Sequence, residues 1–226
     1  MAINIKTRQL DILLNDFELL AKTTLLQHQI ANKLLQNNSI ESLYEEAEAN
    51  EIIIDRLEIK IREEAVFTIF QFNPKAADLR KIITYQDITT NLERIADMLL
   101  NIIHFLKNTD LSSKEFERTK KDIDKMVQCT EKMLRNAILS FSNEDNKIAY
   151  QVIEEDDVVD ELFHKISLYL QEEFADKKLS RLIIRNMIQV NAISHNLERI
   201  GDNATNIAEA TIYLTEGIDI RHGNKD

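Results

Sequence analysis

An internal repeat limits what this chain can fold into more than any other feature of its sequence. The heptapeptide Asn91-Leu-Glu-Arg-Ile-Ala-Asp97 recurs, with Gly in place of Ala, as Asn196-Leu-Glu-Arg-Ile-Gly-Asp202, 105 residues further along. The same offset holds well outside the heptapeptide: Asp55, Leu57, Lys60, Ile61, Arg80 and Asn101 recur as Asp160, Leu162, Lys165, Ile166, Arg185 and Asn206. The repeat therefore predicts two tandem units of the same fold.

The scarcity of turn-forming residues predicts that each unit is helical. Only three Gly and one Pro occur in 226 residues, whereas ordinary sequences contain roughly 7% Gly and 5% Pro. Apolar residues recur at helical spacing between a few short breaks, which gives six helices of about 30 residues. Short connections make successive helices antiparallel. We expect an all-α fold of two tandem, pseudo-symmetric antiparallel three-helix bundles, comprising residues 1–108 and 109–226.

Two helix ends can be predicted from single residues. Asn73 and Pro74 are expected to cap and begin the third helix, because Pro is favoured at the first helical position. Gly217 is expected to end the sixth helix after Glu216, because Gly readily takes the left-handed conformation of a C-cap.

Each half contains two pairs of acidic residues spaced four apart, which lie on one face of a helix. The pairs are Glu51/Asp55 and Glu93/Asp97 in the first half, and Asp156/Asp160 and Glu198/Asp202 in the second. Turns near residues 73 and 176 would place the two pairs of each half at one level on adjacent antiparallel helices. On the third helix these carboxylates lie away from the apolar stripe. We therefore expect one four-carboxylate cluster on the surface of each bundle.

Clusters of this kind suit metal ions. Like charges repel, and oxygen ligands prefer hard or borderline cations. The fourfold recurrence favours one metal site, mononuclear or multinuclear, in each bundle, with all eight carboxylates as ligands. For any single pair, a solvated acidic face with Arg94 or Arg199 as partner is the alternative. The sequence does not encode which of iron, manganese, magnesium, calcium or zinc binds.

Several other polar residues bear on these sites. His104, His164 and Glu209 could extend them. Glu161-Leu-Phe-His164 matches the Glu-x-x-His motif of di-iron carboxylate bundles, but it occurs once, so a di-iron carboxylate enzyme is a remote alternative. The sequence contains no Gly-rich phosphate loop and no recognisable nucleophile–base arrangement. We expect a protein that is not an enzyme.

Charge and cysteine content indicate a compartment. The formal net charge of -11 argues against binding to nucleic acid, which requires basic patches. The single cysteine, Cys129, excludes a disulfide framework and fits a reducing compartment. The sequence has no apolar signal-peptide core and no apolar run of roughly 18 residues or more. These features predict a cytoplasmic location.

The motifs resemble those of one family. Residues 196–209 resemble the C-terminal signature of the PhoU family of phosphate-signalling regulators, residues 93–97 its matching first-half motif, and Ala77-Asp-Leu-Arg80 its lead-in to helix three. Asn203 departs from the pattern, because family members often have His there. The resemblance implies metal clusters on the repeated acidic motifs, with iron favoured and zinc, manganese or magnesium as alternatives.

The resemblance also implies partners. Such a regulator links the ATPase subunit of the phosphate ABC transporter to the sensor histidine kinase of the phosphate regulon. When phosphate is plentiful, it restrains both phosphate uptake and the starvation response. It is peripheral to the membrane through these partners and forms a homodimer. The alternative is a helical accessory subunit of another anion transporter, such as a low-affinity phosphate permease, without a metal function.

Overall fold

Six long α-helices make up the described part of the chain. The computed structural model describes residues 5–111, 113–175 and 177–220, with side chains from Ile12 onward. The helices are α1 (Ile5–Gln36), α2 (Glu41–Phe72), α3 (Ala76–Lys107), α4 (Glu117–Asn143), α5 (Asn146–Phe174) and α6 (Arg181–Glu216), with a 3-10 turn, η1 (Lys114–Phe116), before α4. The predicted all-α fold of six long helices is confirmed. Judged by length and apolar character, none of the helices in the described ranges could span a membrane.

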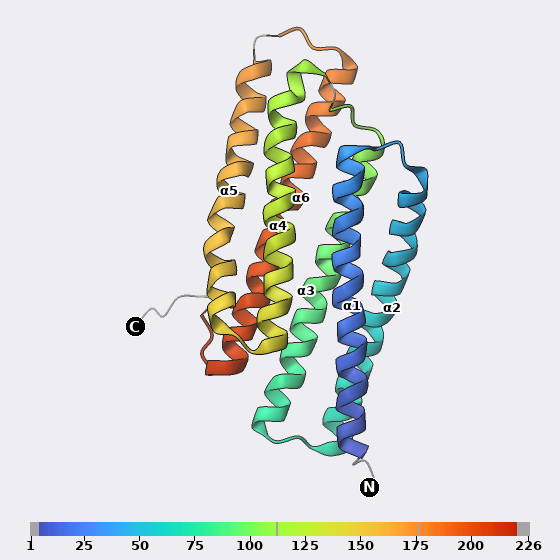
Figure 1. Cartoon of the computed structure of the whole chain (residues 1–226), viewed down its shortest axis with the longest axis vertical. Helices are drawn as coiled ribbons and strands as arrows, with labels where there is room; N and C mark the ends of the chain where they lie inside the picture. The colour runs from blue at the N-terminus through green and yellow to red at the C-terminus, as the bar shows by residue number, and fades with distance from the viewer. Residues whose placement is uncertain (1–4, 112, 176, 221–226) are drawn as a thin grey trace.

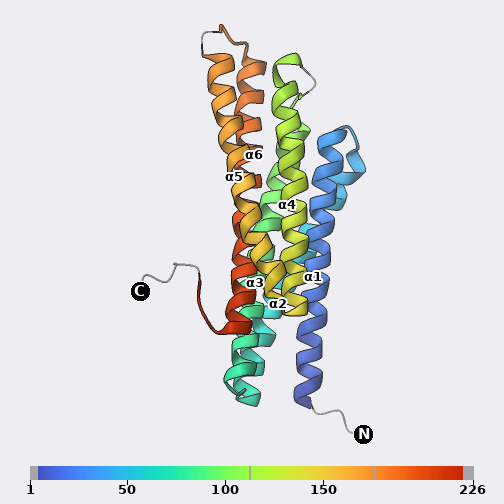
Figure 2. The ribbon, with the colours of Figure 1, turned by 60° about the vertical axis from the view of Figure 1, so that its left-hand side comes forward.

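The helices form two sets of three (Figure 1), with α2 and α5 at opposite outer edges. Turned by 60°, the molecule remains elongated along the helix axes (Figure 2). The two sets meet most extensively where α3 packs on α6. Phe17, Tyr85 and Phe141 join α1, α3 and α4 by edge-to-face contacts, with ring centroids between 4.9 and 5.2 Å apart. The two repeats thus share a continuous core, and the boundary at residues 108 and 109 stays a prediction.

Equivalent ion pairs join the first two helices of each repeat. Lys60 on α2 lies 2.7 Å from Asp16 on α1, and Lys165 on α5 lies 2.7 Å from Asp122 on α4. The two pairs occupy the same place in each three-helix set. The predicted pseudo-symmetry therefore extends from the sequence to side-chain contacts.

A buried histidine connects the two repeats. His28 on α1 is fully buried, and its Nε2 lies within hydrogen-bonding distance, 3.0 Å, of Thr130 Oγ1 on α4. Burial lowers the pKa of His28 to about 4, because a charged imidazolium is poorly solvated there. His28 is thus part of the packing between the repeats.

The helix ends are as predicted at Gly217 and not at Pro74. Gly217 ends α6 in the left-handed conformation, with φ 74°. Asn73 instead ends α2, with φ 41°, and α3 begins only at Ala76, with Lys75 as its N-cap. The prediction that Asn73 and Pro74 begin helix three was wrong. Proline disfavours the right-handed helical conformation in the residue before it, and asparagine tolerates the left-handed one.

Candidate metal centres

The first acidic cluster lies where α2 packs against α3. Glu51 and Glu93 are half-buried, whereas Asp55 and Asp97 are exposed. Burial, followed by interactions with Asp97, Asp55 and Glu93, raises the pKa of Glu51 to about 8. Burial and the charge of Asp97 likewise raise the pKa of Glu93. Asp55 and Asp97 are therefore close enough to oppose the ionisation of Glu51 and Glu93.

The second cluster repeats this arrangement on α5 and α6. Asp156 and Glu198 are half-buried, and Asp160 and Asp202 are exposed. Burial, followed by the charges of Asp202 and Asp160, raises the pKa of Asp156 to about 6. Burial also raises the pKa of Glu198 and of Asp202, with neighbouring carboxylates contributing in each case. Each repeat thus brings its four acidic residues together at the surface, with one carboxylate per helix half-buried.

Unsatisfied buried oxygens show what these clusters lack. Glu51 Oε2 and Asp156 Oδ1 are buried and have no hydrogen-bond partner among the described residues. A buried carboxylate oxygen is costly unless a cation or a donor meets it. Carboxylate oxygens are the type of ligand that hard cations prefer, so the residues of these clusters are chemically suited to bind them.

The acidic side chains of each cluster lie near one another but do not point toward a common centre. Among the described residues, no three Asp, Glu, His or Cys side chains form a group close enough to hold one metal ion. Binding would require the exposed carboxylates to turn toward the half-buried ones. The assignment of all eight residues as metal ligands therefore stays a prediction.

Gly201 gives the second cluster room for Asp156. A Cβ placed on Gly201 would lie 2.9 Å from Asp156 Oδ1, closer than real Cβ contacts permit. The sequence places Ala96 at the equivalent position in the first repeat, opposite the longer Glu51. A carboxylate of the neighbouring helix α5 thus approaches α6 closely at this glycine.

Two neighbours of the clusters were missed from the sequence. Glu58 on α2 contributes to the raised pKa of Glu93. His195 Nδ1 lies 3.5 Å from Glu198 Oε2. Both could have been found from spacing, because Glu58 follows Asp55 by three residues and His195 precedes Glu198 by three, which places each pair on one helix face.

His104, His164 and Glu209, which could extend the metal sites, differ in their surroundings from the eight acidic residues. His104 Nε2 lies 2.6 Å from Glu48 Oε1, bridging α3 and α2. Glu161 and His164 are both exposed, so the Glu-x-x-His motif does not point into the core as a di-iron centre requires. Glu209 is half-buried, and its participation stays a prediction.

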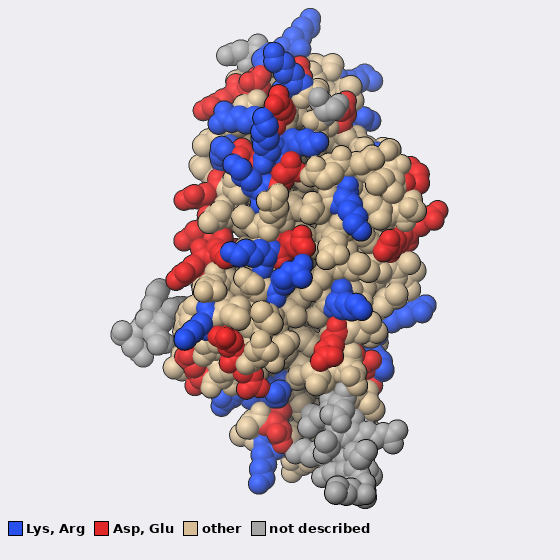
Figure 3. Space-filling view, viewed as in Figure 1, with Lys and Arg blue, Asp and Glu red and all other residues tan. Residues whose placement is uncertain are grey.

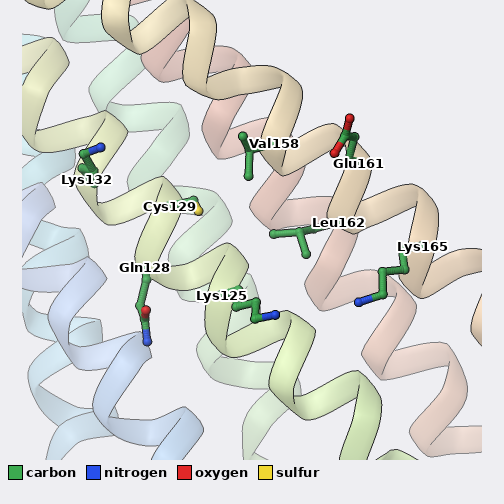
Figure 4. Close-up of a pocket in the computed structure, with 8 residues that line it drawn as sticks. All are labelled: Lys125, Gln128, Cys129, Lys132, Val158, Glu161, Leu162 and Lys165. Atoms are coloured by element: carbon green, nitrogen blue, oxygen red, sulfur yellow. The ribbon is translucent and has the colours of Figure 1, made fainter.

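A separate cleft lies between α4 and α5 and has a different character. Lysines and arginines gather over the upper part of these helices (Figure 3). The cleft has a volume of about 520 Å³, with Lys125, Lys132 and Lys165 around an apolar floor that includes Cys129 (Figure 4). Burial raises the pKa of the Cys129 thiol, which disfavours the reactive thiolate. Cys129 is therefore not an activated thiol.

Comparison with known proteins matches both repeats separately. The profile of the PhoU domain matches residues 17–106 and 123–211. A phosphate-specific transport system accessory protein, PhoU homolog 1, of Thermotoga maritima is 32% identical over 206 residues, covering 86% of this chain and 87% of that protein.

Solved structures agree with this fold. The crystal structure of PhoU from Pseudomonas aeruginosa has a TM-score of 0.77 at 25% identity, covering 93% of this chain and 99% of that one. The phosphate transport system regulatory protein PhoU from Streptococcus pneumoniae has a TM-score of 0.83 at 20% identity, covering 95% and 99%, and this second likeness concerns the fold alone.

Proposed function

This chain belongs to the PhoU family, and from that premise we propose that it regulates phosphate uptake and phosphate-starvation signalling in the cytoplasm. In this proposal the chain is an adaptor between the ATPase subunit of a phosphate ABC transporter and a sensor histidine kinase. Relatives of the chain are named as accessory proteins of phosphate-specific transport systems, which supports association with a transporter.

The observation that carries the proposal is the pair of matched surface clusters. In each repeat, burial and neighbouring carboxylates oppose the ionisation of the half-buried acidic residues, an arrangement that costs stability unless cations meet it. The fold does not need these charges, because the core lies on the other faces of the same helices. Their presence in both repeats is therefore best explained by metal binding.

The residues that would hold metal are the eight acidic ones. Glu51, Asp55, Glu93 and Asp97 would bind it in the first repeat, and Asp156, Asp160, Glu198 and Asp202 in the second. Bound cations would neutralise each cluster and cross-link its two helices. Iron is favoured among the metals, with zinc, manganese or magnesium as alternatives. The metal would have a structural role at a docking face, in keeping with a regulator that is not an enzyme.

Metal content tests the site. The protein is purified without added metal beside a variant in which all eight carboxylates become the corresponding amides. We expect metal in the wild type and almost none in the variant, and circular dichroism confirms that the variant is folded. Equal metal content in the two proteins would remove the site assignment.

Capture of partners tests the adaptor role. The tagged chain is expressed in its own host under phosphate-replete and phosphate-starved conditions, and bound proteins are identified. We expect the ABC ATPase subunit and the sensor kinase, with less of both bound to the eight-carboxylate variant. Capture of a low-affinity phosphate permease without either would contradict the proposal and favour an accessory subunit of that transporter.

A further inference from the structure

A polar pocket lies at the seam between the two repeats, where α3 packs on α6. Both helices lie in the inner part of the molecule, between the outer helices α2 and α5 (Figure 1). The pocket has a volume of about 320 Å³ and is lined by Asp87, Thr90, Asn91 and Arg94 of α3 and by Asn206 and Ala210 of α6. We call it the seam pocket. All of its lining residues except the alanine are polar or charged.

The seam pocket contains repeated residues that the acidic clusters do not use. Asn91, Arg94 and Asn206 all occupy positions at which the 105-residue repeat has the same residue type in both halves. None of the three is buried in the core, because each side chain is exposed or half-buried. Their recurrence is therefore explained neither by core packing nor by the proposed metal sites, and it indicates a further use.

Arg94 supplies the positive charge of the seam pocket. Its side chain is exposed, and within the described ranges it forms no ion pair. A guanidinium presents its N–H donors in a planar fork that matches the oxygens of an oxyanion. Because the formal net charge of the chain is -11, which repels anions, an anion could bind here only through such a local charge.

Neutral hydrogen-bonding groups face the seam pocket from both helices. Asn91 Nδ2 donates to the carbonyl oxygen of Asp87 at 2.8 Å, which leaves its second N–H and its side-chain oxygen for a ligand. Asn206 is half-buried and carries two N–H donors and one acceptor oxygen. Thr90 Oγ1 donates to the carbonyl oxygen of Gln86 at 3.1 Å, so toward the pocket it can only accept.

Asp87 restricts which anion fits. It is exposed and already interacts within the protein. An ionised carboxylate has two oxygens, so it can accept a further hydrogen bond, but it cannot donate one. It therefore repels an anion without a proton and favours one that still carries an O–H group. At neutral pH inorganic phosphate carries such a proton and sulfate carries none. A phosphate monoester, with a second pKa of about 6, has mostly lost it.

We propose that the seam pocket binds inorganic phosphate. Arg94 binds its charged oxygens, Asn91 and Asn206 donate to it from the two helices, and Asp87 accepts its proton. The pocket has room for the anion together with bridging waters, since a water molecule takes about 30 Å³. Binding itself does not depend on the metal clusters or on the adaptor role. Its use as a direct readout of phosphate rests on the proposed function.

The repeat supplies substitutions that the fold already accepts at equivalent positions. At the 105-residue offset, Ala210 corresponds to Phe105 and Asp87 to Ala192. The equivalent positions thus have a large side chain in place of the methyl group and lack the carboxylate. We infer that Ala210→Phe can fill the seam pocket without unfolding the chain.

Isothermal titration calorimetry of the metal-free protein tests the proposal. Treatment with EDTA followed by desalting ensures that phosphate does not bind through metal ions at the acidic clusters. We expect one phosphate to bind per chain, and sulfate and glycerol phosphate to bind more weakly by about tenfold or more. Arg94→Gln removes a charge-assisted hydrogen bond and should weaken phosphate binding about tenfold to a hundredfold. Arg199→Gln, at the equivalent position on α6, is the matched control and should bind as the wild type does.

Two further variants complete the test. Ala210→Phe should abolish binding. Asp87→Asn replaces an acceptor by an amide that can also donate, so it should bring the affinities for phosphate and sulfate close together. Circular dichroism and thermal unfolding check that each variant is folded.

Four results would each overturn the proposal: no phosphate binding by the metal-free wild type, sulfate or glycerol phosphate bound as tightly as phosphate, and unchanged binding in Arg94→Gln or in Ala210→Phe. Because metal content and partner capture are measured in separate experiments, failure of this site and failure of the proposed function are distinguishable.

Discussion

The two acidic clusters occupy equivalent places in the two repeats and differ in their surroundings. The first has the longer Glu51, Ala96 behind it and Glu58 beside it, whereas the second has Asp156, Gly201 and, in place of Glu58, Phe163. His195, which lies near Glu198, replaces Thr90. Both repeats thus keep acidic residues at the same four positions, whereas the residues around them differ. The same pattern of charges is therefore compatible with two different packing environments.

One of these differences is a paired exchange. Asp156 is shorter than Glu51 by one methylene, and its Oδ1 occupies space that a Cβ on Gly201 would need. Burial, with neighbouring carboxylates contributing, raises the pKa of Glu51 to about 8 and that of Asp156 to about 6. The repeats have reached similar clusters by different local packing.

The largest predicted difference between the repeats concerns His28 and the pH dependence of stability. The offset is 106 between α1 and α4, as Asp16 and Asp122 show, so His28 corresponds to Leu134. The folded-state pKa of His28 is lowered to about 4, below its unfolded value, so its contribution is complete above about pH 6.5 and is lost as the pH falls toward 4. Between about pH 7 and pH 4 the loss should be about 3 kcal/mol.

His28→Leu should remove this slope. Thr130 keeps its own bond to the carbonyl of Val127, so the leucine leaves no unsatisfied hydroxyl. Urea unfolding of both proteins at pH 7 and pH 4 measures how much stability each one loses. Subtracting the loss of the variant from that of the wild type cancels the contribution of all other titrating groups. Equal pH dependence in wild type and variant would show that His28 is not the cause.

A smaller effect is expected from the two equivalent ion pairs. The side chain of Asp122 is 6% exposed and that of Asp16 is 14% exposed. Lys165→Met leaves the more buried carboxylate unpaired and should lower the free energy of unfolding by about 2 kcal/mol, whereas Lys60→Met should cost about 1 kcal/mol. Chemical denaturation of the two variants makes the comparison, and a larger loss for Lys60→Met would reverse the ranking.

The smallest effect on stability is expected from exchanging Ala96 and Gly201, the helix residues that face Glu51 and Asp156. Ala96→Gly should cost about 1 kcal/mol through helix propensity and leave metal at the first cluster. In Gly201→Ala the gain in propensity is offset by the 2.9 Å contact with Asp156, so stability should change by less than about 1 kcal/mol. The displaced carboxylate should nevertheless lower the metal content of the second cluster. Denaturation with metal analysis separates the two effects, and unchanged metal in Gly201→Ala would contradict the role given to the glycine.

The sequence predicted the helices and the grouping of the acidic residues because both depend on periodicity. Six helices follow from scarce Gly and Pro, and the common level of the pairs Glu51/Asp55 and Glu93/Asp97 follows from their distances to the turn. The end at Asn73 could not be predicted, because Asn is equally suited to ending one helix and to capping the next. Nor could the burial of Glu51 and Asp156, since it depends on how the helices rotate against each other.

The most direct test of the account is the position of bound metal in a crystal of the protein purified without chelator. Anomalous scattering, measured on both sides of the absorption edge of the metal found by elemental analysis, would locate it. The account predicts metal at two places, one between α2 and α3 at Glu51, Asp55, Glu93 and Asp97, and one between α5 and α6 at Asp156, Asp160, Glu198 and Asp202. Peaks elsewhere, or none at either cluster in a metal-loaded crystal, would contradict it.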